Sequence, residues 1–237
     1  MRIDELSVKI FADGADVAGM VALARQPWVK GFTTNPTLMA KAGVTDYHAF
    51  ASDVLAAIPD RPISFEVFSD EFDEMERQAR AIAAWGEHVF VKIPVTNTRG
   101  ESSAELVRRL SHEGIKLNVT AVMSLRQVEE VVAAVRGGAR SCISVFAGRI
   151  ADTGRDPVPH MTAALELLAV EPKAELVWAS PRELLNIFQA DAIGCHIITV
   201  TSDILQKLAL VGRDLDAFSL DTVKMFHTDA QRVRFSP

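Results

Sequence analysis

Eight short apolar segments recur along the chain, and an amphipathic helical pattern follows each of them. The segments cover residues 8–12, 31–34, 63–68, 89–95, 116–122, 141–147, 175–180 and 197–201. This alternation is typical of parallel strands joined by crossover helices, and eight such units predict closure into a (β/α)8 TIM barrel. The alternative is an open doubly wound sheet, but the first segment is not followed by GxGxxG, and about five or six strands would be more usual there.

The length of the chain fits one barrel. Its 237 residues are close to the roughly 250 that a (β/α)8 barrel commonly needs, so residues 1–237 are predicted to form a single barrel domain. Hydrophobic residues make up 49% of the sequence, which is enough for a large core. Residues 214–237 extend past the eighth unit as a C-terminal helical tail. We expect this extra helix to cover either the barrel or a neighbouring subunit.

Charge and hydropathy exclude several classes of partner. The net charge of −6 arises from acids and bases mixed along the sequence, and no basic stripe is present that could neutralise a nucleic-acid backbone. No apolar run reaches the roughly 18 residues that a membrane span needs. The first residues lack the cationic and apolar regions of a signal peptide. We therefore expect a cytoplasmic protein with no nucleic-acid or membrane partner.

The cysteines and histidines show no metal-binding spacing. Cys142 and Cys195 are far apart and form no CxxC motif, and the six histidines form neither HxxxH nor HExxH. A disulfide framework, a zinc site and a metal-dependent aldolase are therefore all disfavoured. We predict that both thiols are buried and that the protein uses no metal and no cofactor. His196 precedes the last predicted strand and is interpreted as a structural residue.

The fourth apolar segment, VFVKIPV, encloses a single lysine, Lys92, among six apolar residues. Burying an ammonium group without a partner costs several kcal/mol, so this position calls for an explanation. Desolvation favours the neutral amine, which can attack a carbonyl carbon and form an iminium ion. The alternatives are a lysine that reaches out of the barrel mouth or one that pairs with an acid.

Other strands carry polar residues where a barrel interior should be apolar. Glu66 lies in the third apolar segment, and it could pass a proton through a water molecule to Thr120 and the iminium nitrogen. Its alternative role is a salt bridge to Lys92, and that of Thr120 is simple strand packing. Asp13 could act as acid and base on a substrate hydroxyl or could cap a helix. Asn35, before a proline, could cap a turn or bind a sugar hydroxyl.

Six strings of the sequence resemble the transaldolase family, in the same order and at intervals that suit a barrel. They are FADGAD, GFTTNPTL, FEVFS, FVKIPVT, LNVTAVMS and SVFAGRIADTG. The resemblance covers roughly residues 8–205. TTNP, VKIP and GRI followed by an acidic residue are together quite specific, although each is weak alone.

The resemblance implies a (β/α)8 barrel that acts on sugars and sugar phosphates. In it, Lys92 forms a Schiff base with a dihydroxyacetone unit, and Asp13 is the acid and base on the hydroxyl of the departing aldehyde. Glu66 and Thr120 orient the catalytic water. The resemblance also implies contacts with the substrate from Thr34, Asn35, Ser144, Phe146, Arg149, Ser180 and Arg182, with Arg149 facing a substrate anion.

The family also contains short fructose-6-phosphate aldolases, which resemble this chain in length. They differ by a glutamine at the position of Glu66 and a tyrosine at that of Phe146, so the pair found here favours transfer of the three-carbon unit over its simple release. The alternatives are a lyase that releases dihydroxyacetone and a non-catalytic sugar-binding barrel. The short subgroup tends to form rings of five and their dimers, which implies a homo-oligomer, either a pentamer or a decamer.

The seventh strand departs from the family pattern. The family has Ala-Ser-Phe followed by Arg or Lys, whereas this chain has VWASPREL. Ser180 and Arg182 can therefore be aligned only by choice, and Pro181 can turn Arg182 away from the substrate. Arg182 either binds an anion or is an ordinary surface residue at the start of a helix.

Overall fold

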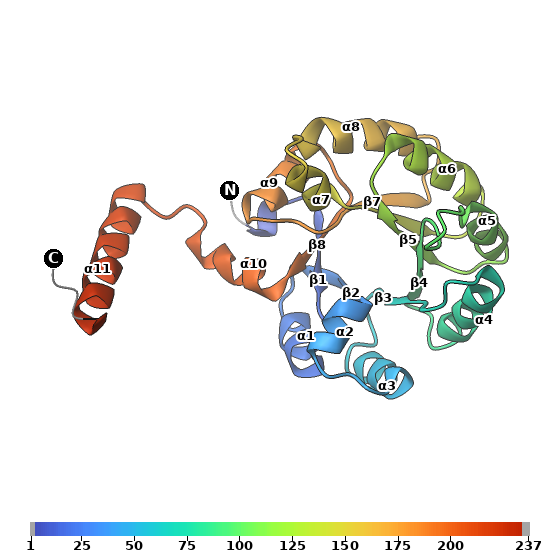
Figure 1. Ribbon diagram of the computed structural model, residues 1–237, viewed down its shortest axis with the longest axis horizontal. Coiled ribbons are helices and arrows are strands. Elements are labelled where there is room, and N and C mark those ends of the chain that lie inside the picture. The colour runs from blue at the N-terminus through green and yellow to red at the C-terminus, as the bar shows by residue number, and fades with distance from the viewer. Residues whose placement is uncertain (1–2, 234–237) are drawn as a thin grey trace.

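The computed structural model, which describes residues 3–233, contains a closed barrel of eight parallel strands (Figure 1). The strands follow one another around the barrel in chain order, and the first pairs with the last. The predicted (β/α)8 barrel is confirmed, since each apolar segment overlaps one strand. The strands are β1 Lys9–Asp13, β2 Val29–Thr33, β3 Ile63–Glu66, β4 Val89–Pro94, β5 Leu117–Val122, β6 Ser141–Val145, β7 Ala174–Trp178 and β8 Ile197–Thr201.

The structure contains eleven α-helices within residues 3–233, and all but the last lie around the barrel (Figure 1). They are α1 Val17–Ala24, α2 Pro36–Lys41, α3 Tyr47–Ala57, α4 Phe72–Ala83, α5 Ala104–His112, α6 Leu125–Val135, α7 Ala147–Asp152, α8 Pro157–Leu168, α9 Leu185–Ala192, α10 Ser202–Gln206 and α11 Leu215–Val233. Two short 3-10 helices cover Ile3–Glu5 and Lys207–Leu210. Three of the helices, α2, α7 and α10, are short and begin directly after β2, β6 and β8, so they shape the carboxyl end of the barrel.

Toward the amino ends of the strands, the barrel interior is filled by an apolar cluster of Phe11, Phe90, Cys142, Val177 and Ile197. Side chains alternate between the two faces of a strand, so the residue two positions further along each strand also points inward. Those residues stand at the carboxyl end, where Asp13, Lys92, Ser144, Ala179 and Thr199 line a cavity. The barrel interior is therefore packed with apolar side chains toward the amino ends of the strands and carries mainly polar side chains at their carboxyl ends.

One glycine is needed for this packing. A Cβ atom at Gly31 would lie 2.6 Å from the ring of Phe11 on the neighbouring strand. Only glycine therefore leaves room for the phenyl group inside the barrel.

The C-terminal helix α11 stands apart from the barrel (Figure 1). None of its residues is buried, and Leu215, Val223 and Phe226 are each more than half exposed. The predicted tail is thus helical over residues 215–233, while 234–237 lie outside the described residues. It does not cover its own barrel. Within residues 3–233, no helix is long and apolar enough to span a bilayer.

Candidate functional site

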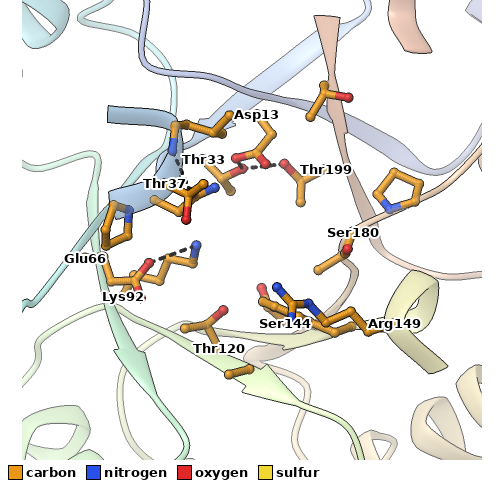
Figure 2. Close-up of a pocket in the computed structure, with 18 of the residues that line it drawn as sticks. Asp13, Thr33, Thr37, Glu66, Lys92, Thr120, Ser144, Arg149, Ser180 and Thr199 are labelled. Atoms are coloured by element: carbon orange, nitrogen blue, oxygen red, sulfur yellow. Dashed lines mark hydrogen bonds and ion pairs between the residues drawn. The ribbon is translucent and has the colours of Figure 1, made fainter. Parts of the chain in front are cut away.

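A cavity of about 730 Å³ opens at the carboxyl end of the barrel, where barrel enzymes place their chemistry. Figure 2 shows the polar side chains that converge on it from different strands. The predicted site residues that line it are Asp13, Asn35, Glu66, Lys92, Thr120, Ser144, Phe146, Arg149, Ser180 and Arg182. Of the predicted residues, only Thr34 is not among the described residues of the cavity wall.

Lys92 extends from the middle of β4 into the cavity, and only 7% of its surface is exposed. Its Nζ lies 3.2 Å from Oε2 of Glu66 and donates a hydrogen bond of 3.0 Å to the carbonyl oxygen of Thr34. Glu66 and Lys92 are register partners on adjacent strands, so both side chains point to the same face. The alternative of a lysine reaching out of the barrel mouth is therefore wrong. The ion pair foreseen for Glu66 is present.

The strand that carries Glu66 is anchored from outside the barrel. The hydroxyl group of Tyr47 on α3 donates a 2.9 Å hydrogen bond to the carbonyl oxygen of Glu66. Burial raises the pKa of this phenol above its ordinary value, so the group remains protonated and can act as the donor. The ring of Tyr47 packs against Phe65 and Trp85. This contact fixes the end of β3 and with it the position of the carboxylate.

Asp13 ends β1 and faces the cavity beside Thr33 and Thr199 (Figure 2). Its Oδ1 accepts a 2.8 Å hydrogen bond from the hydroxyl of Thr33, which also contacts the hydroxyl of Thr199 on β8. Burial raises the pKa of Asp13, while the charge of Lys92 and the Thr33 hydrogen bond lower it without cancelling the rise. The helix-cap interpretation of Asp13 is wrong, because Asp16 caps α1.

Thr33 and Thr199 are site residues that sequence analysis did not find. The string TTNP contains two adjacent threonines, and the strand register decides which one faces inward. Thr33 pairs with Asp13 and lines the cavity, whereas Thr34 is fully buried and donates its hydroxyl to the carbonyl oxygen of Ser64. Thr34 takes part in the site through its backbone, which accepts the hydrogen bond from Lys92.

Thr120 faces the cavity beside an irregularity in β5. Its Oγ1 is buried and has no hydrogen-bond partner among the described residues, so it keeps its full capacity to bind a water molecule or a substrate atom. The next residue, Ala121, adopts φ of 60°, and the register between β5 and β6 shifts between Val119 and Val122. Such a bulge re-aims side chains near functional sites and costs local strain.

A chain of hydrogen-bonded polar side chains runs from Ser144, which lines the cavity, to Ser64 on β3. The hydroxyl of Ser144 donates to Oδ1 of Asn118 at 2.7 Å, and Nδ2 of Asn118 donates to the hydroxyl of Ser64 at 3.0 Å. Asn35 uses its Oδ1 to cap α2 through the backbone N–H of Leu38, as one of its two interpretations foresaw. Asn35 also lines the cavity, where its side-chain amide N–H groups can donate hydrogen bonds.

Three cations besides Lys92 line the cavity. Arg149, on α7, lies over the ring of Phe146 at 5.5 Å, and no ion pair of Arg149 is found among the described residues. Arg182 also lines the cavity, but its guanidinium group is paired with Asp152. Lys41, at the end of α2, adds a further cation to the wall. The carboxylate of Asp152 interacts with Arg149 through its charge but forms its ion pair with Arg182, so Arg149 is the arginine better placed to meet a substrate anion.

The segment that carries Arg149 is locked against β7 by a close backbone approach. A Cβ atom at Gly148 would lie 1.6 Å from the carbonyl oxygen of Ser180, so this position requires glycine. Ser180 itself adopts φ of 59°, an uncommon conformation for a residue with a side chain. The two features together fix the position of Ser180 relative to α7.

The remaining titratable residues set aside by the sequence analysis are structural. Cys142 and Cys195 are buried free thiols, as predicted, and burial raises the pKa of each to about 12. Nδ1 of His196 accepts a hydrogen bond of 3.0 Å from the backbone N–H of Leu176. Burial lowers the pKa of this imidazole, which agrees with its use as a neutral acceptor.

Comparison with known proteins identifies the family. The model of the family described as transaldolase/fructose-6-phosphate aldolase matches residues 10–236. The chain belongs to this family. It is 32% identical to a "probable transaldolase" of Dehalococcoides mccartyi over 202 residues, which cover 85% of this chain and 90% of that protein. It is 33% identical to "probable transaldolase 2" of Listeria monocytogenes over 220 residues, which cover 90% of this chain and 95% of that protein.

Solved structures share the fold of the transaldolase/fructose-6-phosphate aldolase chain at low identity. Citrate synthase SbnG superposes with a TM-score of 0.59 at 11% identity, covering 97% of this chain and 96% of that one. Dihydrodipicolinate synthase from Rhodopseudomonas palustris gives 0.56 at 14% identity, covering 93% and 80%. These likenesses concern the barrel alone. The family match spans every residue of the cavity described above.

Proposed function

We propose that this protein is a transaldolase-type transferase that moves a dihydroxyacetone unit from a ketose donor to an aldehyde acceptor. The observation that carries the proposal is the placement of Lys92, a buried amine inside the barrel with a carboxylate 3.2 Å away. Membership of the transaldolase/fructose-6-phosphate aldolase family supports it. Asp13, at the end of β1, supplies a second acid or base in the same cavity, so the cavity has the groups that both halves of an aldol reaction need.

The first half of the reaction forms the Schiff base. Glu66 accepts a proton from the ammonium group of Lys92, and the neutral amine attacks the ketone carbon of the donor. The resulting carbinolamine loses its hydroxyl as water when Glu66 returns the proton, which leaves an iminium ion. Thr120, whose hydroxyl has no protein partner among the described residues, holds the water that carries this proton.

The second half breaks and remakes the carbon–carbon bond. Asp13 removes the proton from the hydroxyl group next to the bond, the bond breaks, and its electron pair moves onto the iminium to give an enamine while an aldehyde leaves. An acceptor aldehyde reverses these steps, and water then hydrolyses the new iminium and frees Lys92. The raised pKa of Asp13 makes it a stronger base than an ordinary carboxylate.

We propose sugar phosphates as the substrates, because Arg149 offers a guanidinium without an ion pair in the wall of the cavity. The ketose would contact four further residues of the cavity wall, Asn35, Ser144, Phe146 and Ser180. Arg182 contributes less to binding the phosphate group, because it already forms an ion pair with Asp152. Phosphate on the donor should therefore lower KM in the parent protein much more than in an Arg149→Ala variant.

A borohydride trap tests the Schiff base. The protein is mixed with fructose 6-phosphate, reduced with borohydride and analysed by intact-mass spectrometry and peptide mapping. The expected result is one reduced dihydroxyacetone adduct on Lys92, and no adduct in a Lys92→Arg variant, which keeps the positive charge but not the nucleophile. An adduct on another lysine, or unchanged turnover in the Lys92→Arg variant, would refute the mechanism.

The lyase activity of a fructose-6-phosphate aldolase is the second candidate, because the family includes both reactions. Glu66 and Phe146 favour transfer. The two are separated by measuring dihydroxyacetone release from fructose 6-phosphate with and without an acceptor such as erythrose 4-phosphate. Release that needs no acceptor and proceeds as fast as transfer would identify a lyase.

We further propose that residues 1–237 form one barrel domain whose tail, 214–237, packs on a neighbouring subunit of a homo-oligomer, either a pentamer or a decamer. The support is the exposed apolar surface of α11, which includes Leu220, Val223 and Phe226. A helix with such a surface is normally covered by another element.

A further inference from the structure

A second cavity, of about 180 Å³, lies at the amino end of the barrel, opposite the candidate active site. Its floor is formed by Phe11, Phe90, Cys142 and Ile197. Each of these residues precedes, by two positions in the chain, a residue that lines the candidate active site. One apolar layer therefore separates the two cavities. The second cavity is therefore not an extension of the first.

The rim of this cavity carries an excess of positive charge. Lys9, Lys30, Lys116 and Arg140 line it, and Glu175 is the only acid among its described lining residues. On a chain of net charge −6, such a local excess of cations is unusual.

The single carboxylate is already shared by two of these cations. Glu175 forms ion pairs with Lys9 and Arg140. Lys30 and Lys116 instead donate hydrogen bonds to the backbone carbonyl oxygens of Pro27 and Glu87, at 2.8 and 2.6 Å. A carbonyl oxygen orients an ammonium group but does not neutralise its charge, so the four cations and one carboxylate of the rim leave three positive charges uncompensated beside an apolar floor that strengthens their field.

We propose that this cavity binds a small, multiply charged oxyanion of the phosphate or polyphosphate class, at a site distinct from the active site. The volume suits such a ligand, because 180 Å³ corresponds to roughly six water molecules at about 30 Å³ each. Lys30, on β2, and Lys116, just before β5, would bind its oxygens, and the half-buried Lys9 would contribute through its charge. The apolar floor excludes water from one side of the ligand and offers no acceptor that would repel it.

Inorganic pyrophosphate is a suitable probe, and isothermal titration calorimetry measures its binding. The titration uses an Arg149→Ala parent, so that the cation proposed to bind substrate phosphate does not contribute. We expect saturable binding by the parent, and a dissociation constant about tenfold higher after Lys30→Ala and Lys116→Ala are combined. Glu175→Gln should tighten binding, because it removes the carboxylate that competes for the cations.

A charge-matched control separates a site from general electrostatics. Arg77→Ala combined with Arg108→Ala removes the same two charges from exposed helical positions away from the cavity. This control should bind pyrophosphate as the parent does. Equal weakening in both double variants, or no saturable binding by a parent that is folded by circular dichroism, would overturn the proposal. Because activity is not the readout, either result leaves the transaldolase proposal untouched.

Discussion

The ion pair between Lys92 and Glu66 can be measured by a double-mutant cycle on stability. Lys92→Met and Glu66→Gln are made singly and together, and urea unfolding is followed by tryptophan fluorescence. Each single change leaves one charged group in the barrel without its partner, whereas the double variant leaves none. Both single variants should therefore be less stable than the parent, and the double variant should recover most of that loss.

The geometry sets the size of the effect. Two unit charges 3.2 Å apart attract each other by about 5 kcal/mol at an effective dielectric constant of roughly 20. The side chains remain 9% and 15% exposed and border an open cavity, so water screens part of this attraction. We therefore expect a coupling free energy of about 2 to 3 kcal/mol. The hydrogen bond from Lys92 to the Thr34 carbonyl is lost in both the single and double lysine variants and cancels in the cycle.

A surface pair provides the control. Glu74 and Arg77 form an exposed ion pair on α4, and the same cycle with Glu74→Gln and Arg77→Met should show little or no coupling. If the Lys92 and Glu66 substitutions are simply additive, or if their coupling is no larger than that of the surface pair, the charges do not interact as the structure indicates. The role of Glu66 as the proton acceptor for Lys92 would then also fail.

Three further predictions concern other parts of the molecule. Burial holds the pKa of Asp13 above its unfolded value, so ionisation destabilises the fold as pH rises above about 4. Asp13→Asn should therefore be inactive yet gain stability relative to the parent as pH rises from about 4. A difference in thermal unfolding that stays constant with pH would contradict this. Gly148→Ala should lower the free energy of unfolding by about 2 to 3 kcal/mol. The control, Gly14→Ala, should lower it by less than about 0.5 kcal/mol, because nothing lies within 4 Å of the added carbon. Equal urea midpoints for the two variants would show that the backbone contact at Gly148 is not tight. Phe226→Asp on α11 should lower the molar mass measured by light scattering, whereas the nearby Lys224→Gln should not. An unchanged molar mass for Phe226→Asp would show that the tail is not part of the subunit interface.

The barrel could be predicted because its signal is spread over the whole sequence. Eight apolar segments separated by helical patterns leave few topologies open, and small errors at the ends of single strands do not change the result. The second segment was placed at 31–34, whereas β2 covers residues 29–33. This shift does not affect the fold, but it does affect the site.

The site could be predicted only as far as residue identity allowed. Lys92 is conspicuous because a lone charge stands in an apolar strand, but Thr33 and Thr34 look alike in the sequence and differ only in which face of β2 they occupy. Polar residues that are common in strands, such as Thr199, carry no signal of their own. Their importance arises from a neighbour on another strand, and that neighbour is set by the register.

Backbone strain and long-range ion pairs also could not be predicted from the sequence. Ala121 and Ser180 adopt positive φ, although neither residue type favours it, because the surrounding strands and α7 hold them there. The pairing of Arg182 with Asp152 joins the segment after β7 to the end of α7, 30 residues away in the sequence. Contacts of this kind depend on the assembled structure.

The chain of hydroxyl groups that reaches Asp13 crosses the seam where the first and last strands meet. Thr33 belongs to β2 and Thr199 to β8, nearly at opposite ends of the chain, and their contact exists only when β1 has paired with β8. Contacts between such distant residues form slowly, because closing a long loop costs entropy before any contact stabilises it. A partly folded or C-terminally shortened chain that lacks β8 would still carry Lys92, Glu66 and Thr120 but would leave Asp13 without this support. Recovery of activity during refolding thus reports the closing of the barrel, and recovery of helical signal does not.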